Sequence, residues 1–344
     1  LVFAGLLLYV EYGTWQMTDL MAAVANGESS LRAQIAAVLL AQAALIKCAQ
    51  LPLHGWLIQV VEAPTPVSAL LHAGVINLGG VLLIMFAPLI SQVPVAQWWI
   101  LIVAGVSTAI AVSVMSVETN VKAQLAWSTS AQMGLMLIEC ALGLYHLALL
   151  HLLAHSCYKA WSFLAAGTRV ARPAQRPVSA LWVAPVAAAI ATTTMVFLPD
   201  ALGTTMPLSS RTLLAVLLFA VLLEALVSKR APRLIMAALA GLGMVVMYTG
   251  LEHTAAQLID TNVLSASSAA DLWVSGLLVS MAVLWWVVRQ FGHYPVGAWL
   301  QHKLYRGLYL DEWFTRATLR LCPVRLPNTL ALTTTKHTTT QECL

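Results

Sequence analysis

The chain has 344 residues, of which 60% belong to the hydrophobic set and only 9% are charged. A soluble domain carries about 25% charged and roughly 45–50% apolar residues, so this composition excludes an ordinary soluble protein. The formal net charge of +4 is small and favours basic membrane loops over nucleic-acid binding. The five cysteines form no CxxC pair, so we interpret them as packing residues and not as metal ligands or disulfides.

Apolar runs of about 20 residues without two-residue alternation predict membrane-spanning helices, because a helix satisfies its own backbone inside the bilayer. The sequence opens inside such a run, Leu1–Val10, without an initiator Met, which we interpret as a helix whose preceding residues are missing. The other runs lie at 31–50, 67–90, 98–117, 123–142, 147–168, 179–198, 212–228, 233–250 and 272–289. We therefore expect an all-α, polytopic transmembrane bundle with a broken helix and about nine or ten membrane helices.

Basic residues gather in alternate loops. They occur at 169–178, at 228–233 and between 289 and 325, whereas the loops at 199–210 and 251–271 carry acidic residues. The positive-inside rule then places the basic loops and the C-terminus in the cytoplasm. We expect a multi-pass protein of the bacterial inner membrane.

The sequence divides into four predicted regions. Residues 1–170 form an antiporter-like channel core, and 171–290 form additional transmembrane helices. Residues 291–325 mix aromatic with charged side chains, which predicts a cytoplasmic-side amphipathic docking segment. Residues 326–344 are rich in threonine without periodicity and are predicted to be disordered.

Two helix interruptions lie beside ionisable side chains. Lys47 precedes Pro52 by five residues, and because proline removes a backbone donor the helix should break near residues 50–53. A buried Lys at such a break is typical of an ion site, although a lysine snorkelling from a helix end is the alternative. Pro66 and a capping Thr65 should start the next helix, which carries His72. His72 is either a proton-relay residue or a hydrogen-bonded core histidine.

His151, His155 and Lys159 recur every four residues. On a helix they share one face over about 12 Å of axis. Histidine exchanges protons near neutral pH, and a buried lysine can be brought into the same range. The pattern predicts a proton path along this helix, with a set of interhelical hydrogen bonds as the alternative.

Other ionisable residues are weaker candidates. Lys122 follows Glu118 by four residues, so it is either a pathway residue or half of a surface ion pair. Four further residues are accessory candidates: His54, Glu62, Glu139 and Glu224. His54 is also explicable as an interfacial residue, and Glu224 as a snorkelling one. No spacing indicates a nucleotide, haem, cluster or metal site, so we expect no catalytic group and no cofactor in this chain.

Three segments resemble one membrane family. They are KCAQLPLHGWL at 47–57 with EAPTPVSALLHA at 62–73, NVKAQLAWSTSAQMG at 120–134 and HLLAHSCYKA at 151–160. In this order they resemble the proton-conducting subunits of respiratory complex I (chain 5/L-like) and of Mrp-type cation/proton antiporters.

The resemblance implies roles for particular residues. Lys47 would be the lysine of the broken helix, His72 a connecting histidine and Lys122 a basic residue of the second half-channel. His151, His155 and Lys159 would continue the path. The family's glutamate partner for Lys47 lies on an earlier helix and has no counterpart here, and its later lysine has none between 179 and 230, where Glu224 is the only intramembrane ionisable residue.

Two segments narrow the resemblance. AGVINLGG at 73–80 and GLYLDEWFT at 307–315 look most like the membrane subunit of the DAB inorganic-carbon transporter. This implies a large soluble carbonic-anhydrase-like partner that carries zinc, and coupling of H+ or Na+ flow to CO2/bicarbonate uptake. The alternatives are a subunit of a respiratory NADH–quinone oxidoreductase or an Mrp-type antiporter, whose partners would be other membrane subunits, and a non-conducting anchor.

Overall fold

The structure is a computed structural model that describes residues 1–27, 29–168, 183–201, 207–228, 231–258, 267–291 and 294–322. Every regular element in these ranges is helical, which confirms the predicted all-α class. The predicted basic loop at 169–178 and the predicted disordered tail at 326–344 lie outside the described residues.

The first half of the chain forms a series of helices separated by short turns. They are α1 (Val2–Tyr12), α2 (Met17–Asn26), α3 (Leu31–Lys47), α4 (Gly55–Gln59), η1 (Val60–Glu62), α5 (Thr65–Ala73), η2 (Val75–Asn77), α6 (Leu78–Met85), α7 (Ala87–Ser91), α8 (Pro94–Val117), α9 (Val121–Ala141), α10 (Tyr145–Leu164) and η3 (Ala166–Thr168).

The second half contains longer helices and a C-terminal pair. They are α11 (Val183–Ala201), α12 (Leu208–Ser228), α13 (Ala231–Leu258), α14 (Ser268–Phe291), α15 (Pro295–Tyr305), η4 (Gly307–Tyr309) and α16 (Leu310–Leu321).

Local sequence explains where the site-bearing helices begin and end. Asn120 caps α9, because its side-chain oxygen accepts from the backbone N–H groups of Lys122 and Ala123. The short turn into α10 contains Gly143 at φ +78°, a left-handed conformation that glycine adopts without strain. This tight turn sets α9 and α10 against each other as packed neighbours.

The start of α5 differs from the prediction. Thr65 is the first helical residue and makes no capping hydrogen bond, so the prediction that Thr65 caps this helix was wrong. Pro64 already holds the extended conformation of the capping position, which moves Thr65 into the first turn together with Pro66.

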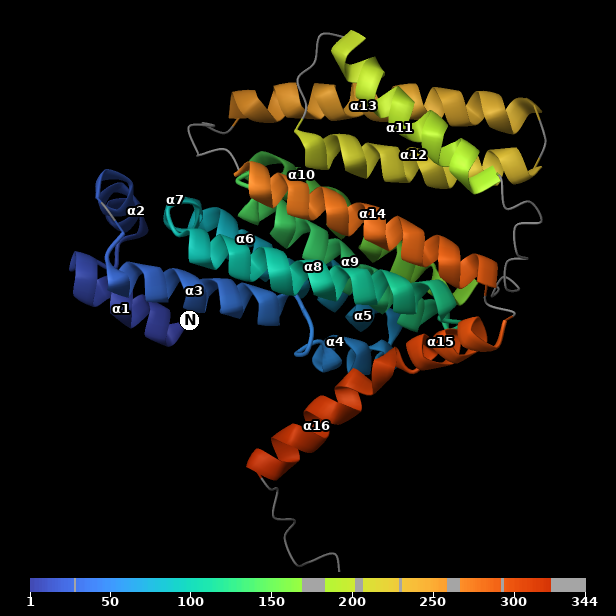
Figure 1. The fold of residues 1–344 in the computed structure, drawn as a ribbon. Helices are drawn as coiled ribbons and strands as arrows, with labels where there is room; N and C mark the ends of the chain where they lie inside the picture. Colours follow the sequence, from blue (N-terminus) through green and yellow to red (C-terminus); the bar gives the residue numbers. More distant parts are fainter. Residues whose placement is uncertain are drawn as a thin grey trace, which may run out of the picture.

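The helices pack as two groups (Figure 1). In the first group, α9 packs against α8 and α10, α10 also packs against α5, and α3 packs against α1, α6 and α8. In the second group, α12 packs against α11, α13 and α14 around its own apolar core. Helix α14 joins the groups because it also packs against α8. Helix α16 projects from the side opposite α11–α13.

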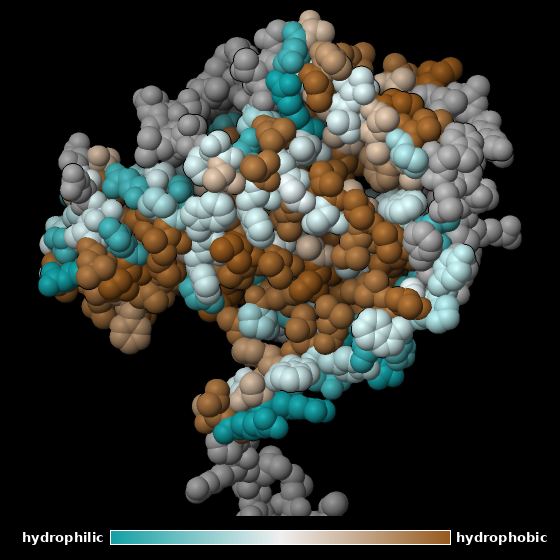
Figure 2. Space-filling view, viewed as in Figure 1, coloured by the Kyte–Doolittle hydropathy of each residue, from teal (hydrophilic) through white to brown (hydrophobic). Residues whose placement is uncertain are grey.

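Four of the described helical segments are long and apolar enough to cross a membrane: Thr65–Met85, Pro94–Val117, Val183–Ala201 and Ser268–Val288. Shorter apolar helices are Val2–Tyr12, Leu208–Leu223 and Ile235–Gly250. Helices α9 and α10 are long enough but carry lysine, histidine, serine and glutamine, which lowers their hydropathy. Figure 2 shows hydrophobic side chains gathered where α8 and α14 lie, and hydrophilic ones along α15 and α16.

Candidate functional site

The predicted path centres on one face of α10, and we call His151, His155 and Lys159 the α10 row. Lys159 is completely buried and His155 is 3% exposed, whereas His151 keeps 22% of its side chain exposed. Each member contacts α9, and because the two helices are antiparallel, successive row members meet α9 residues progressively nearer its start. The row is therefore a helix–helix seam inside the protein and does not face lipid.

Lys159 lies at one end of this seam. Its Nζ donates to Ser128 Oγ at 2.8 Å and to the carbonyl oxygen of Leu125 at 3.1 Å. A lysine ammonium has three donors, so these two acceptors leave one donor position open. No acidic residue in the described part of the chain pairs with Lys159. The geometry suits an amine that receives or passes a proton through a third partner such as water.

His155 contacts an oxygen atom with each ring nitrogen. Its Nδ1 lies 2.8 Å from Gln132 Oε1, and its Nε2 lies 3.1 Å from the carbonyl oxygen of His72. Only the doubly protonated ring can donate to both oxygens, because neutral imidazole has a single N–H. When the ring is neutral, the Gln132 amide can turn its NH2 group toward Nδ1 and donate instead. Gln132 is thus able to satisfy both protonation states of His155.

His151 is hydrogen-bonded to Glu139 near the end of α9. His151 Nδ1 lies 2.9 Å from Glu139 Oε1, and both side chains are about four-fifths buried, with exposures of 22% and 20%. The ring centroids of His151 and His155 are 6.5 Å apart, too far for direct transfer and within reach of one bridging water. The structure therefore brings Glu139, a predicted accessory residue, into contact with the row.

His72 joins this arrangement from α5. Its ring is fully buried and stacks on Phe163 with 4.3 Å between centroids, and neither ring nitrogen has a hydrogen-bond partner in the described ranges. Buried polar atoms are nearly always paired with protein or ordered water, so this ring needs a partner such as a water molecule. The backbone carbonyl of His72 already contacts His155. The structure thus places His72 beside the row.

Lys122 lies at the start of α9. Its Nζ donates to the carbonyl oxygen of Ala63 at 2.7 Å, in the loop before α5. The alternative ion pair with Glu118 does not form, because Glu118 accepts from the backbone N–H groups of Thr119 and Asn120. Lys122 therefore connects the end of α9 that is remote from Glu139 to the second helix interruption.

The predicted break after Lys47 is confirmed, and polar side chains of neighbouring helices support it. Gln50 Nε2 donates to the carbonyl oxygens of Cys48 at 2.7 Å and Ser130 at 3.1 Å. Ser130 Oγ donates to the carbonyl oxygen of Ala49 at 2.9 Å, and Ser107 Oγ accepts from the N–H of Leu51. Non-helical backbone at membrane depth persists only where protein groups satisfy it. Sequence reasoning missed Gln50, Ser107 and Ser130, although each is polar within an apolar stretch.

Three predicted residues are not brought to the row. Lys47 is half-buried at the end of α3, and within the described part of the chain it forms no hydrogen bond or ion pair. Glu62 is exposed at the end of η1. Glu224 lies on α12, and its side chain is outside what the structure describes.

His54 belongs to a different contact, between the break and the C-terminal segment. Its buried ring lies 5.1 Å from that of Trp127, and Asp311 of α16 approaches both His54 and the backbone of Gly55. Burial lowers the pKa of His54, while the Pro52 carbonyl and the Asp311 charge act in the opposite direction. The start of α16 therefore docks on the loop between α3 and α5.

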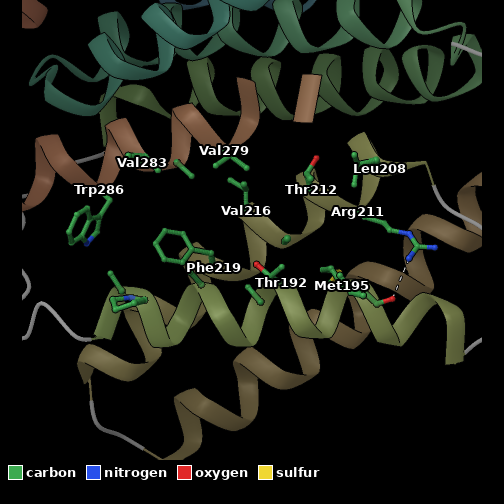
Figure 3. A pocket seen from close by; sticks show the side chains of 17 residues that line it. Thr192, Met195, Leu208, Arg211, Thr212, Val216, Phe219, Val279, Val283 and Trp286 are labelled. Carbon is green, nitrogen blue, oxygen red and sulfur yellow. Dashed lines mark hydrogen bonds between the residues drawn. The ribbon is translucent and has the colours of Figure 1, made fainter. Parts of the chain in front are cut away.

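The second helix group holds an apolar cavity of about 610 Å3 between α11, α12 and α14 (Figure 3). Apart from Thr192, Arg211 and Thr212, its lining is apolar. Arg211 is bound to Asp200 at 2.7 Å. Because the cavity offers no row of proton-exchanging side chains, the candidate site remains the seam of α9 and α10.

Comparison with known proteins identifies the class. Residues 1–179 match the family described as NADH:quinone oxidoreductase/Mrp antiporter, TM, and this match includes the whole α10 row. The chain belongs to this family, which confirms the resemblance seen in its sequence. Together with the apolar helices, this makes it a multi-pass membrane protein.

Its named relatives include inorganic-carbon transporter subunits. The chain is 47% identical over 341 residues to the probable inorganic carbon transporter subunit DabB of Hydrogenovibrio crunogenus, covering 95% of the chain and 64% of the relative. It is 33% identical over 353 residues to the probable subunit DabB2 of Halothiobacillus neapolitanus, covering 95% and 62%. The chain thus spans a little under two thirds of the length of each.

A solved structure supports the fold. The Mrp complex from Dietzia sp. DQ12-45-1b contains a chain that superposes with a TM-score of 0.53 at 21% identity. The match covers 93% of this chain and 41% of that one. At this identity the likeness shows a shared antiporter-like helix arrangement and nothing further.

Proposed function

We propose that the chain is a proton-translocating membrane subunit that energises the uptake of inorganic carbon, as CO2 or bicarbonate. One observation carries the translocation half of this proposal: all three members of the α10 row hydrogen-bond to α9 inside the bundle. The row offers imidazole and amine groups, which exchange protons, whereas hard cations such as Na+ prefer oxygen ligands. The proposal therefore favours H+ over Na+ as the coupling ion.

The residues divide into a core and two ends. Lys159, His155, His72 and His151 form the core of the path, with water between rings that do not touch. Lys122 provides the end near α5. Lys47 supports the proposal by its position at the break, where a proton could enter the path.

The names of the relatives support the inorganic-carbon half. Both long matches are to proteins named as probable inorganic carbon transporter subunits, and both extend over 95% of the chain, including the C-terminal segment. Because the chain spans only part of those proteins, the activity of a whole transporter is part of the proposal. Proton flow down its gradient would supply the free energy for carbon uptake.

A soluble carbonic-anhydrase-like partner would dock on α15 and α16. Exposed aromatic and apolar side chains occur there beside basic ones: Trp299 is 61%, Trp313 75% and Leu321 83% exposed. Lys303 and Arg306 both lie near the Tyr309 ring. Any zinc for CO2 hydration would belong to that partner. The basic loops support a cytoplasmic position for this surface, in the bacterial inner membrane.

Growth complementation tests the proposal. The full-length protein, with and without a carbonic-anhydrase-like partner, is expressed in a strain that needs high CO2. We expect growth in ambient air only with both proteins, and loss of growth with Lys159→Ala. Cys157→Ser, on the exposed side of the same helix, is the matched control and should retain growth.

Other results identify the alternatives. NADH-dependent quinone reduction by the purified complex, without rescue in air, would assign the chain to a respiratory oxidoreductase. Growth in ambient air that persists after substitution of both Lys47 and Lys159 would show that this chain is a non-conducting anchor. Uptake that follows a Na+ gradient at constant pH would show that Na+, and not H+, is the coupling ion.

A further inference from the structure

A titratable cluster lies at the turn between α9 and α10, beyond the predicted path. Glu139 is in the last turn of α9, and His146 is the second residue of α10. Glu139 Oε1 is paired with His151, but its Oε2 is buried and finds no hydrogen-bond partner among the described residues. His146 Nε2 is also buried and has no hydrogen-bond partner within the part of the chain that the structure describes.

The two atoms belong to residues on either side of one short turn, because α9 ends at Ala141 and α10 begins at Tyr145. Leaving a buried polar atom unpaired is costly, so a purely structural cluster would not be expected to leave two. A carboxylate oxygen and an imidazole nitrogen at one turn can exchange a proton through a bridging water. The cluster is thus equipped for exchange, not only for packing.

The position of the cluster fits the end of a path. Lys122 lies at the start of α9 and Glu139 in its last turn, so the two mark opposite ends of the seam. His146 lies five residues before His151, toward the turn. The other titratable groups beside it, Cys140 and Tyr145, are buried, and the Tyr145 hydroxyl donates to the carbonyl oxygen of Ala87.

Building on the proposed function, we propose that Glu139, His146 and His151 form the proton-exchange site at the end of the path opposite Lys122. His151 Nδ1–H gives its proton to Glu139 Oε1, so one N–H bond breaks and one O–H bond forms. The carboxyl group then passes a proton through a bridging water to His146 Nε2. His146 then releases a proton from Nδ1 to water at the α9–α10 turn. Each transfer moves one proton and no electrons. The cluster returns to its first state when His151 takes up the next proton from the α10 row and the hydrogen of His146 exchanges from Nε2 back to Nδ1 through water.

Proton flux through the full-length protein in liposomes tests this site, with an internal pH-sensitive dye as the readout. We expect His146→Ala and Glu139→Gln each to lower the flux about tenfold or more, in the range of a positioned proton-transfer group. The double variant should be no slower than the slower single variant, because both act in one series of transfers. His146→Gln, which keeps a polar side chain of similar size, serves if His146→Ala does not fold.

Imidazole separates a chemical role from a structural one. Added imidazole should restore flux to His146→Ala, because it can replace the lost ring at a turn near solvent, and should not restore Lys159→Ala, whose site is fully buried. Cys157→Ser is the control for flux through an otherwise unchanged α10. Thermal unfolding of each variant reports folding.

The outcomes separate this site from the proposed function. Loss of flux in Lys159→Ala with wild-type flux in the Glu139 and His146 variants would overturn the exchange site and keep the proposed function. A wild-type protein without proton flux would overturn both. A His146→Ala protein that is slow, thermally destabilised and insensitive to imidazole would show that His146 only holds the turn together, which contradicts the proposal.

Discussion

The α9–α10 seam and the α11–α14 group are both built from helices of one membrane protein, but polar side chains are distributed differently along them. Along the seam, polar and ionisable residues occur from Lys122 to Glu139 on α9 and from His146 to Lys159 on α10. In the second group, the described ion pair Arg211–Asp200 and the contacts of Asp271 lie near the ends of α11, α12 and α14. Its interior is an apolar core.

This difference indicates a division of labour. Ionisable side chains within membrane helices are expensive and are retained mainly where they pair or face water. The seam supplies such partners for its histidines and its lysine. The second group packs around an apolar core, and its described helix-to-helix hydrogen bonds, Thr212–Ser275 and Tyr248–Ser210, join uncharged hydroxyl groups, as expected of a scaffold. We therefore propose that translocation takes place in the seam, and we expect changes in the second group to act through stability alone.

The largest expected effect comes from the buried end of the seam. Lys159→Ala removes the amine that bridges Ser128 and Leu125, so proton flux of the full-length protein in liposomes should fall about 100-fold, as for loss of an acid–base group. Flux within twofold of wild type would show that the path does not pass Lys159.

Gln132→Leu should have the next largest effect. It removes the amide that satisfies both protonation states of His155 and leaves a ring nitrogen unpaired, at about 1–3 kcal/mol. We expect the flux to fall about tenfold for that reason. Gln97→Leu on α8, which removes a bond to the backbone of Ser91, is the matched control and should leave the flux unchanged. Equal effects of the two variants would argue against a special role for Gln132.

Much of this arrangement could be predicted from the sequence. The features that could not be predicted are contacts between segments that lie far apart in the chain. Proline spacing predicted the break after Lys47, and four-residue spacing predicted the α10 row, because both are local properties of the chain. Contacts between distant segments were not predicted. Gln50 meets Ser130 across 80 residues, and His155 meets the His72 carbonyl across 83 residues.

Two histidines show the same limit. His54 was grouped with the break, but packing takes it toward Trp127 and Asp311. His146 was overlooked because a single histidine near a turn has no periodicity of its own. Its signal was the nearby Glu139 on the other side of a short turn, which becomes informative once α9 and α10 are known to be antiparallel.

A packing variant in the second group tests whether these helices contribute to stability alone. Leu223 is fully buried in the apolar core of that group, and Leu223→Ala should lower the thermal unfolding midpoint by loosening van der Waals contacts between helices. Proton flux per folded molecule should stay at the wild-type value. A fall in flux comparable to that of Gln132→Leu would mean that the scaffold helices belong to the path.

The smallest expected effect concerns pH and the C-terminal contact. Burial lowers the folded-state pKa of His54 below its ordinary value of 6.5, so its contribution to stability is fully present above that pH and is lost as the pH falls below it. On acidification from pH 7.5 to pH 5.5, the thermal midpoint of the wild type should therefore fall relative to that of His54→Gln. A difference that is constant with pH would show that His54 titrates alike in the folded and unfolded states.

The central claim is that the seam of α9 and α10 is a hydrated route for protons. An experimental density map of the full-length protein in a lipid nanodisc, at a resolution that shows ordered water, tests it most directly. The account predicts water between His151 and His155, beside the His72 ring and at the open donor position of Lys159. A dry seam, or row side chains turned toward lipid, would contradict it.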